Sequence, residues 1–132
     1  MNKRTVHQII HYLSRAIAVG ITAFFSLFIL EGFGPDFGWQ DSVAHAVPAA
    51  ILGLATFAAW KKPVIGGLFF IACAIAFGVT VFLTSTMPDE GRSADLLFSM
   101  APILLFITSI GVLFLVDARL QKTEIKRKEP DK

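Results

Sequence analysis

The sequence predicts an all-α fold: an antiparallel four-helix transmembrane bundle of an integral membrane protein. Four apolar stretches, each of about 19–22 residues, cover roughly 9–30, 42–60, 64–84 and 96–116. At about 1.5 Å per residue, a helix of that length crosses a hydrocarbon core of about 30 Å. The composition agrees, with 55% hydrophobic residues and a mean hydropathy of +0.66. Apolar residues surround each predicted helix rather than forming one stripe, which is typical of a membrane span.

The first stretch has a basic start and an apolar run, as a cleaved signal peptide also has. The C-terminal end of this stretch, Leu27 to Glu31, lacks the small residues that a signal peptidase needs. Cleavage would also leave three spans with an inverted N-terminus. We therefore expect a retained first span.

The second and third stretches are joined by Trp60-Lys-Lys-Pro63, which is short enough to predict a tight hairpin. Pro63 suits the first turn of a helix, because its missing N–H has no partner there in any case. Trp60 and Trp39 fit the aromatic belts at the two membrane interfaces. The single cysteine, Cys73, has no partner for an internal disulfide, so we interpret it as a packing residue.

The fourth stretch ends at Asp117 and is followed by a basic tail. We divide the chain into a transmembrane domain, residues 1–118, and a basic cytoplasmic tail, residues 119–132. The tail can continue the fourth helix until Pro130 stops it. Its charge acts as an orientation signal, and contact with anionic lipid or docking of a cytoplasmic partner are the alternatives.

Basic residues predict the orientation of the chain. All but one of the 12 lysines and arginines precede or open the first span, lie between the second and third, or follow the fourth; the exception is Arg92. The other two loops carry six acidic residues: Glu31, Asp36, Asp41, Asp89, Glu90 and Asp95. The positive-inside rule then predicts that both termini are cytoplasmic. The formal net charge of +2 averages a basic face and an acidic face, and does not indicate nucleic-acid binding.

A weak internal repeat is consistent with a duplicated helical hairpin. Asp41 and Asp95 each lie seven residues before a proline, Pro48 and Pro102. Both aspartates suit the N-cap of the helix that follows, since a carboxylate there accepts from free backbone N–H groups. Two matched pairs also arise by chance, so both explanations stay open.

Six residues make up a candidate polar pocket on the outer side. Each proline frees a backbone carbonyl four residues earlier, and facing kinks would line a small cavity. His45 is an ionisable group inside a span, which is a functional candidate by default. The alternatives are structural: prolines are tolerated in membrane helices, and His45 can simply hydrogen-bond between helices. The candidate residues are Glu31, Ser42, His45, Pro48, Ser99 and Pro102.

His7 and His11 lie one helical turn apart at the cytoplasmic start of the first span, so they share a helix face. Two imidazoles at that spacing can bind a metal, but the sequence suggests no third ligand at that depth. His45 lies near the opposite side of the membrane, which argues against a haem held by histidines. We therefore expect no metal site, no cofactor and no catalytic residues.

The middle third of every span has no Asp, Glu, Lys or Arg. Ion-coupled transporters usually need such a group near the midplane. Small residues occupy the middle instead, as in Ala49-x3-Gly53 and Ala74-x3-Gly78, and favour tight helix packing. The leading function hypothesis is thus a non-catalytic accessory or scaffold component of the membrane, with a membrane-protein partner or a second copy of itself. The alternative is a small homo-oligomeric channel or transporter that uses the outer pocket; an enzyme is the least favoured class.

Three short motifs resemble an uncharacterised prokaryotic family of small four-helix integral membrane proteins. They are His45–Pro48, the run Ala59-Trp-Lys-Lys-Pro-Val-Ile-Gly-Gly67, and Ala101-Pro-Ile-Leu-Leu105. The resemblance covers roughly residues 9–116. It implies a multi-pass protein of the prokaryotic cell (inner) membrane. It implies no activity, because that family has none assigned.

The transport alternative makes a direct prediction. If the outer pocket carries solute, His45→Ala should reduce flux into liposomes that contain the purified chain, because it removes the pocket's one imidazole. A His45→Ala variant with full flux would rule the pocket out as the pathway.

Overall fold

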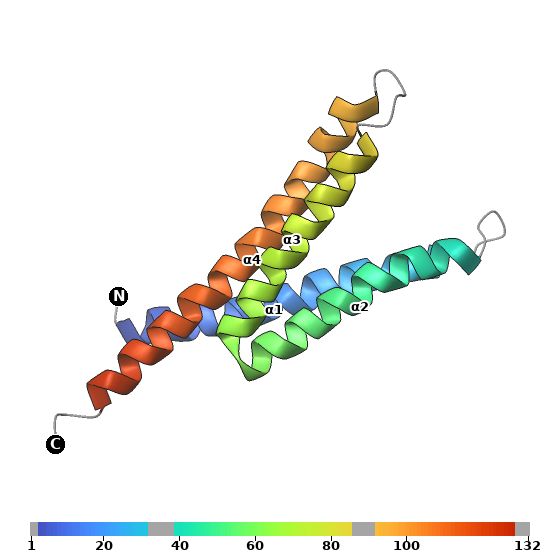
Figure 1. Cartoon of the computed structure of the whole chain (residues 1–132). Helices are drawn as coiled ribbons and strands as arrows, with labels where there is room; N and C mark the ends of the chain where they lie inside the picture. The colour runs from blue at the N-terminus through green and yellow to red at the C-terminus, as the bar shows by residue number, and fades with distance from the viewer. Residues whose placement is uncertain (1–2, 32–38, 86–91, 129–132) are drawn as a thin grey trace.

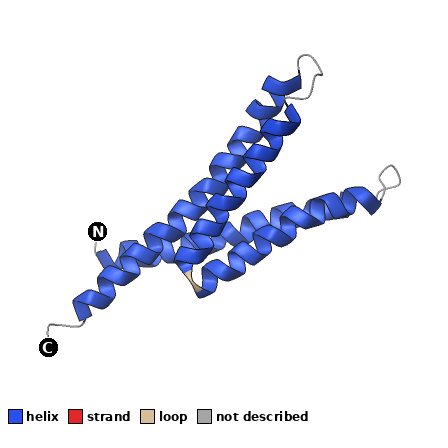
Figure 2. Ribbon diagram, in the orientation of Figure 1, coloured by secondary structure: helices blue, strands red, loops and turns tan. Residues whose placement is uncertain are grey.

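The computed structural model describes residues 3–31, 39–85 and 92–128, which form four helices (Figure 1). They are α1 (Lys3–Glu31), α2 (Trp39–Lys61), α3 (Pro63–Ser85) and α4 (Arg92–Lys128). Across these ranges the chain is helical, with a single non-helical residue, Lys62, between α2 and α3 (Figure 2). The predicted all-α class with four helices is confirmed.

Three of the helices are long and apolar enough to cross a membrane. The qualifying segments are Thr5–Leu30 in α1, Pro63–Leu83 in α3 and Phe98–Ile125 in α4. They match three of the four predicted spans. The fourth, residues 42–60 in α2, is not among these segments and remains a prediction.

All four helices extend beyond the limits of the predicted apolar stretches. α4 has 37 residues and continues through the basic tail as far as Lys128. α2 begins at Trp39 and α4 at Arg92, so Asp41 and Asp95 lie inside the first turns rather than before them. The N-cap prediction for these two aspartates is therefore wrong.

The four helices form two arms that meet at one end and diverge toward the other (Figure 1). α1 lies beside α2 in one arm, and α3 lies beside α4 in the second. Near the turn between α2 and α3 the arms cross, and the start of α1 and the end of α4 lie at that same end. We call this region the vertex. The arrangement is more open than a bundle packed along its whole length.

The buried core draws on all four helices. Its members are Ala18, Ile21, Leu52, Ala55, Ala59, Phe70, Ala74, Ile107, Ile110 and Phe114. Phe70 of α3 and Phe114 of α4 are fully buried and stack with ring centroids 6.0 Å apart. The other eight members of the core are equally divided between alanine and the larger aliphatic residues isoleucine and leucine. The core is thus a stacked aromatic pair packed among small and branched aliphatic side chains.

Glycines set how closely the helices approach at the vertex. A Cβ atom on Gly66 would overlap the backbone of Ala59, which comes from α2. A Cβ on Gly67 would lie 2.8 Å from the carbonyl oxygen of Gly111, and one on Gly111 would lie 2.7 Å from the carbonyl oxygen of Gly67. Small residues let helix backbones come this close, and packing then holds the helices together.

Larger side chains explain why the arms separate away from the vertex. Phe24, Phe25, Pro102 and Phe106 line a groove of about 590 Å³ between α1 and α4. A second groove, of about 370 Å³, is lined by Phe25, Pro48 and Phe77 among others. Where bulky residues replace alanine and glycine, the helices cannot keep the short spacing of the vertex.

A buried hydroxyl pair joins α1 to α2 within the first arm. The Oγ1 atoms of Thr22 and Thr56 are 2.9 Å apart, and the Thr22 hydroxyl also donates to the Ala18 carbonyl at 2.9 Å. Thr56 is buried. A hydrogen bond of this kind contributes about 0.5–1.5 kcal/mol to stability, so packing remains the main stabilising term.

Gly111→Ala and Gly67→Ala should each destabilise the fold by about 1–3 kcal/mol, because the added methyl group meets backbone that cannot move aside. Gly20→Ala is the matched control, since a Cβ there has no neighbour within 4 Å. Thermal unfolding in detergent, followed by circular dichroism, measures the difference. Equal midpoints for all three variants would contradict the close approach of α3 and α4.

Candidate functional site

A cluster of polar side chains lies at the vertex, where the start of α1 crosses the end of α4. α1 supplies His7, His11 and Arg15, and α4 supplies Asp117, Gln121 and Glu124. The three α1 residues follow one another at intervals of four, and the three α4 residues at intervals of four and three. Each set of three therefore lies on one face of its helix. The two faces meet, so six polar groups share one small volume.

Asp117 is the centre of the cluster, and its side chain is 0% exposed. Its Oδ2 atom accepts from Arg15 Nη1 at 3.2 Å and from Gln121 Nε2 at 3.1 Å. A buried carboxylate is costly unless it is paired and hydrogen-bonded. Arg15 supplies the opposite charge, and Gln121 supplies a further donor.

His11 approaches the same carboxylate through Nδ1, which lies 3.1 Å from Oδ2 and 3.3 Å from Oδ1 of Asp117. Arg15 Nη1 lies 2.7 Å from that same Nδ1 atom. A ring nitrogen either carries a hydrogen or offers a lone pair. Since arginine only donates, its contact requires a lone pair on Nδ1, whereas a bond to Asp117 requires a hydrogen there. One nitrogen cannot satisfy both neighbours at once.

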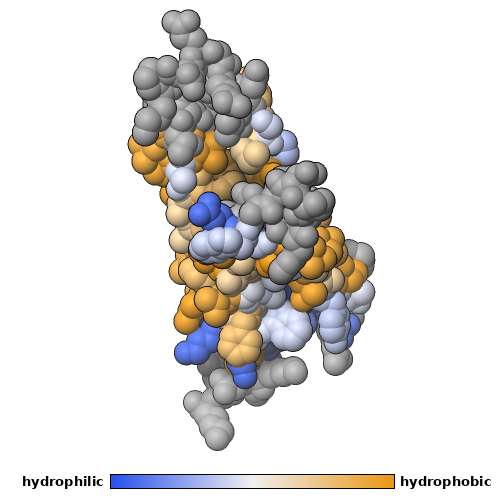
Figure 3. Space-filling view, turned by 90° about the vertical axis from the view of Figure 1, so that its right-hand side faces the viewer, coloured by the Kyte–Doolittle hydropathy of each residue, from blue (hydrophilic) through white to orange (hydrophobic). Residues whose placement is uncertain are grey.

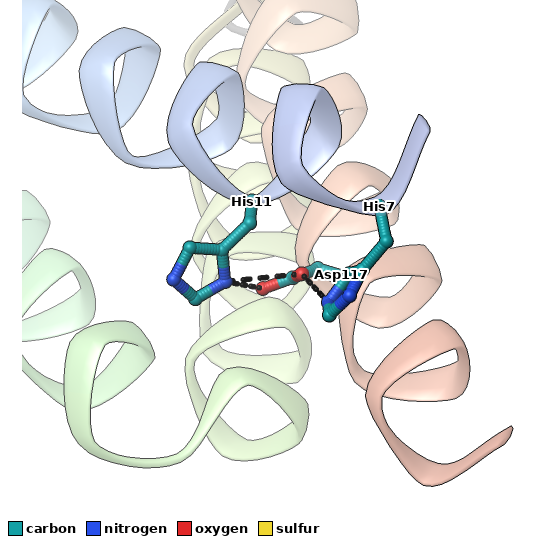
Figure 4. A group of neighbouring side chains, drawn as sticks. All are labelled: His7, His11 and Asp117. Atoms are coloured by element: carbon teal, nitrogen blue, oxygen red, sulfur yellow. Dashed lines mark hydrogen bonds and ion pairs between the residues drawn. The ribbon is translucent and has the colours of Figure 1, made fainter. Parts of the chain in front are cut away.

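His7 completes the group in Figure 4, with its ring turned toward Asp117. Its Nε2 atom is 3.3 Å from Asp117 Oδ1, and its Nδ1 atom is 3.2 Å from Glu124 Oε2. Nε2 is buried and has no hydrogen-bond partner among the described residues. The contact with Asp117 is therefore close without hydrogen-bond geometry.

This arrangement can do two things chemically. It holds α1 against α4 through a buried ion pair, and it presents two imidazoles and a carboxylate whose ligand atoms all lie within 4.8 Å of one another. His7 and His11 were predicted to share a helix face, but no third ligand was expected at that depth. That part of the interpretation is wrong, because Asp117 lies beside both histidines. Its position next to the end of the fourth span was the signal available in the sequence.

The outer-pocket residues of α2 are distributed along its surface. His45 is exposed, with its ring centroid 5.9 Å from that of Phe28 in α1. Ser42 donates to the carbonyl oxygen of Ile29 at 3.4 Å. Pro48 lines the groove of about 370 Å³. Both His45 and Ser42 thus contact α1 rather than α4.

The outer-pocket residues of α4 belong to the second arm. Pro102 lines the groove of about 590 Å³, together with α1 residues. Ser99 is exposed. The side chain of Glu31 lies outside the described residues. Since Pro48 and Pro102 line different grooves and the arms diverge, the outer pocket remains a prediction from the sequence.

Asp117→Ala should destabilise the protein by about 3 kcal/mol, because it removes the buried carboxylate that pairs with Arg15 and accepts from Gln121. Arg119→Ala, an exposed change two residues along the same helix, is the control and should shift stability by less than about 0.5 kcal/mol. Thermal unfolding compares the two. If Asp117→Ala unfolds at the wild-type temperature, the buried ion pair does not hold α1 to α4.

Comparison with known proteins gives a family and no activity. Searches of curated proteins and of solved structures returned no match. A family model described as a domain of unknown function, DUF7670, matches residues 1–126 and therefore includes both faces of the polar cluster. The chain belongs to the DUF7670 family.

Proposed function

We propose that this protein is a non-catalytic scaffold or accessory component of a prokaryotic cell membrane, with four spans and both termini in the cytoplasm. One observation carries the proposal: polar and apolar side chains occupy different parts of the molecule. Polar groups gather at the vertex, and large apolar side chains are exposed along the arms. Figure 3 displays apolar residues over much of one such face. In water an apolar surface of this extent would drive association, whereas lipid covers it at no cost.

The fourth span is supported by the connections of α2. α1 and α3, which flank it in the chain, are both long and apolar enough to cross. α2 has 23 residues, and its Leu54 and Phe57 side chains are 62% and 63% exposed. Since one residue separates α2 from α3, the end of α2 must lie at the same membrane face as the start of α3.

The orientation is supported by charge at the vertex. Lys61 and Lys62 lie at the turn between α2 and α3, and Arg119 and Lys122 lie on the last part of α4. In Figure 1 the start of α1 and the end of α4 are at this end of the molecule. Short basic segments stay on the cytoplasmic side during insertion. The polar cluster then lies close to the cytoplasmic interface.

A scaffold role is supported by the two apolar grooves beside the diverging arms. Their linings consist almost wholly of aliphatic and aromatic side chains, such as Ile17, Phe25 and Phe106. Such surfaces suit lipid chains or apolar helices of a second membrane protein better than a hydrated solute. We therefore propose a membrane-protein partner or a second copy of this chain as the occupant of the arm surfaces.

Two measurements test this proposal. Single-cysteine labelling in a Cys73→Ala background should mark positions 62 and 122 from the cytoplasmic side only, and position 37 from the outer side only. Native mass spectrometry after gentle extraction should then reveal a stoichiometric second polypeptide or a homo-oligomer. Labelling of position 122 from outside would overturn the orientation. A homo-oligomer or a monomer without a second polypeptide, combined with solute flux in liposomes, would favour the transport alternative over the scaffold.

A further inference from the structure

We propose that His7, His11 and Asp117 bind one divalent first-row transition-metal ion, of the class that includes Zn²⁺, at the crossing of α1 and α4. This goes beyond a scaffold role, because it assigns a ligand to the polar cluster. The ion would take three protein ligands and leave at least one position open to water. The inference rests on four features of the cluster: its donor types, their spacing, the state of His7 and the charge around Asp117.

The donor set is the first feature. Imidazole nitrogen and carboxylate oxygen are both ordinary ligands of zinc and of neighbouring divalent metals. Two histidines four residues apart on a helix present their rings to a single ion, as in helical zinc motifs. Asp117 adds the third ligand from a different helix. A site of two histidines and one carboxylate with an open position is common for such metals.

The distances are the second feature. Two donors each about 2.0–2.1 Å from a tetrahedral ion are about 3.3 Å from one another. His7 Nε2 is 3.3 Å from Asp117 Oδ1, and His11 Nδ1 is 3.1 Å and 3.3 Å from the two carboxylate oxygens. These separations already match those of ligands on one ion. The separation between the two histidine donors is bounded as well, since one ligand atom from each of the three residues lies within 4.8 Å of the others.

The state of His7 is the third feature. Glu124 Oε2 lies 3.2 Å from Nδ1, so the nearby carboxylate favours the tautomer of a neutral ring that has its hydrogen on Nδ1. Nε2 then carries a lone pair, and it is buried beside an Asp117 oxygen with no hydrogen-bond partner. Two facing acceptors repel one another unless a cation lies between them. A carboxylate behind a ligating histidine is the usual outer-shell arrangement of zinc sites, and here Glu124 takes that position.

The charge around Asp117 is the fourth feature, and it makes Arg15 a competitor of the metal ion. Arg15 neutralises Asp117 and touches His11 Nδ1 at 2.7 Å, so its guanidinium competes with an incoming cation for the same two atoms. Its side chain is 19% exposed and long enough to swing toward solvent. Gln121 still donates to Asp117 Oδ2 when the arginine leaves. Arg15 and the metal ion are thus alternative counter-charges for one carboxylate.

The test measures Zn²⁺ binding to the full chain in detergent, purified without a histidine tag and stripped with a chelator. Equilibrium dialysis with elemental analysis gives the stoichiometry, and titration calorimetry gives the affinity. We expect one ion per chain. His7→Gln and Asp117→Asn should each weaken binding at least tenfold, and Glu124→Gln should weaken it about 10- to 100-fold.

His45→Gln is the matched control, because it removes a histidine outside the cluster and should bind as wild type does. If Asp117→Asn fails to fold, His7→Gln decides the question, with helix content confirmed by circular dichroism. The proposal is overturned if wild type binds no stoichiometric ion. It is also overturned if His7→Gln binds as wild type does, or if His45→Gln loses as much affinity as His7→Gln.

Arg15→Gln tests the competition directly. With a positive charge removed from beside the ion, affinity for Zn²⁺ should rise by about tenfold or more. In the presence of chelator the same variant should unfold at a lower temperature than wild type, and added Zn²⁺ should reverse that loss. Weaker Zn²⁺ binding by Arg15→Gln would show that the arginine supports the site instead of competing for it.

Discussion

The buried carboxylate of Asp117 is the constraint on which the joining of the two arms depends. A charge at 0% exposure must find partners, and its partners on the other arm are Arg15, His11 and His7, all from α1. α1 is therefore fixed against α4 in both rotation and register. Without that requirement, the arms would be linked by the short turn at Lys62 and by apolar packing, which has little directional preference.

A second constraint acts at the same end of the molecule. The Gly66–Ala59 approach and the Gly67–Gly111 approach bring α3 close to α2 and α4 near the vertex. Close packing of backbones and hydrogen bonds between polar groups both hold helices together. The close glycine contacts and the polar cluster both lie near the vertex. The far halves of the arms carry phenylalanines and prolines instead, and there the structure opens into grooves.

The sequence was sufficient to predict the four helices, because the length and hydropathy of the apolar stretches indicate where the helices lie. The Trp60–Pro63 hairpin and the continuation of α4 into the basic tail followed from local rules. The divergence of the arms did not, because it depends on which side chains face one another, and that depends on the rotation of each helix. The N-cap prediction for Asp41 and Asp95 was wrong for a local reason. A helix can begin a few residues before the side chain that is best suited to cap it.

The metal-ligand set shows where sequence reasoning stops and why. His7 and His11 were recognisable as a pair, since four residues make one turn. Asp117 stood directly after an apolar span and was interpreted only as its boundary. Yet if both termini lie on one side of the membrane, the start of the first span and the end of the fourth must reach the same depth. Matching polar residues by depth would have brought Asp117 to the histidines. That the carboxylate points toward α1, and that Arg15 shares it, depends on side-chain geometry that no spacing encodes.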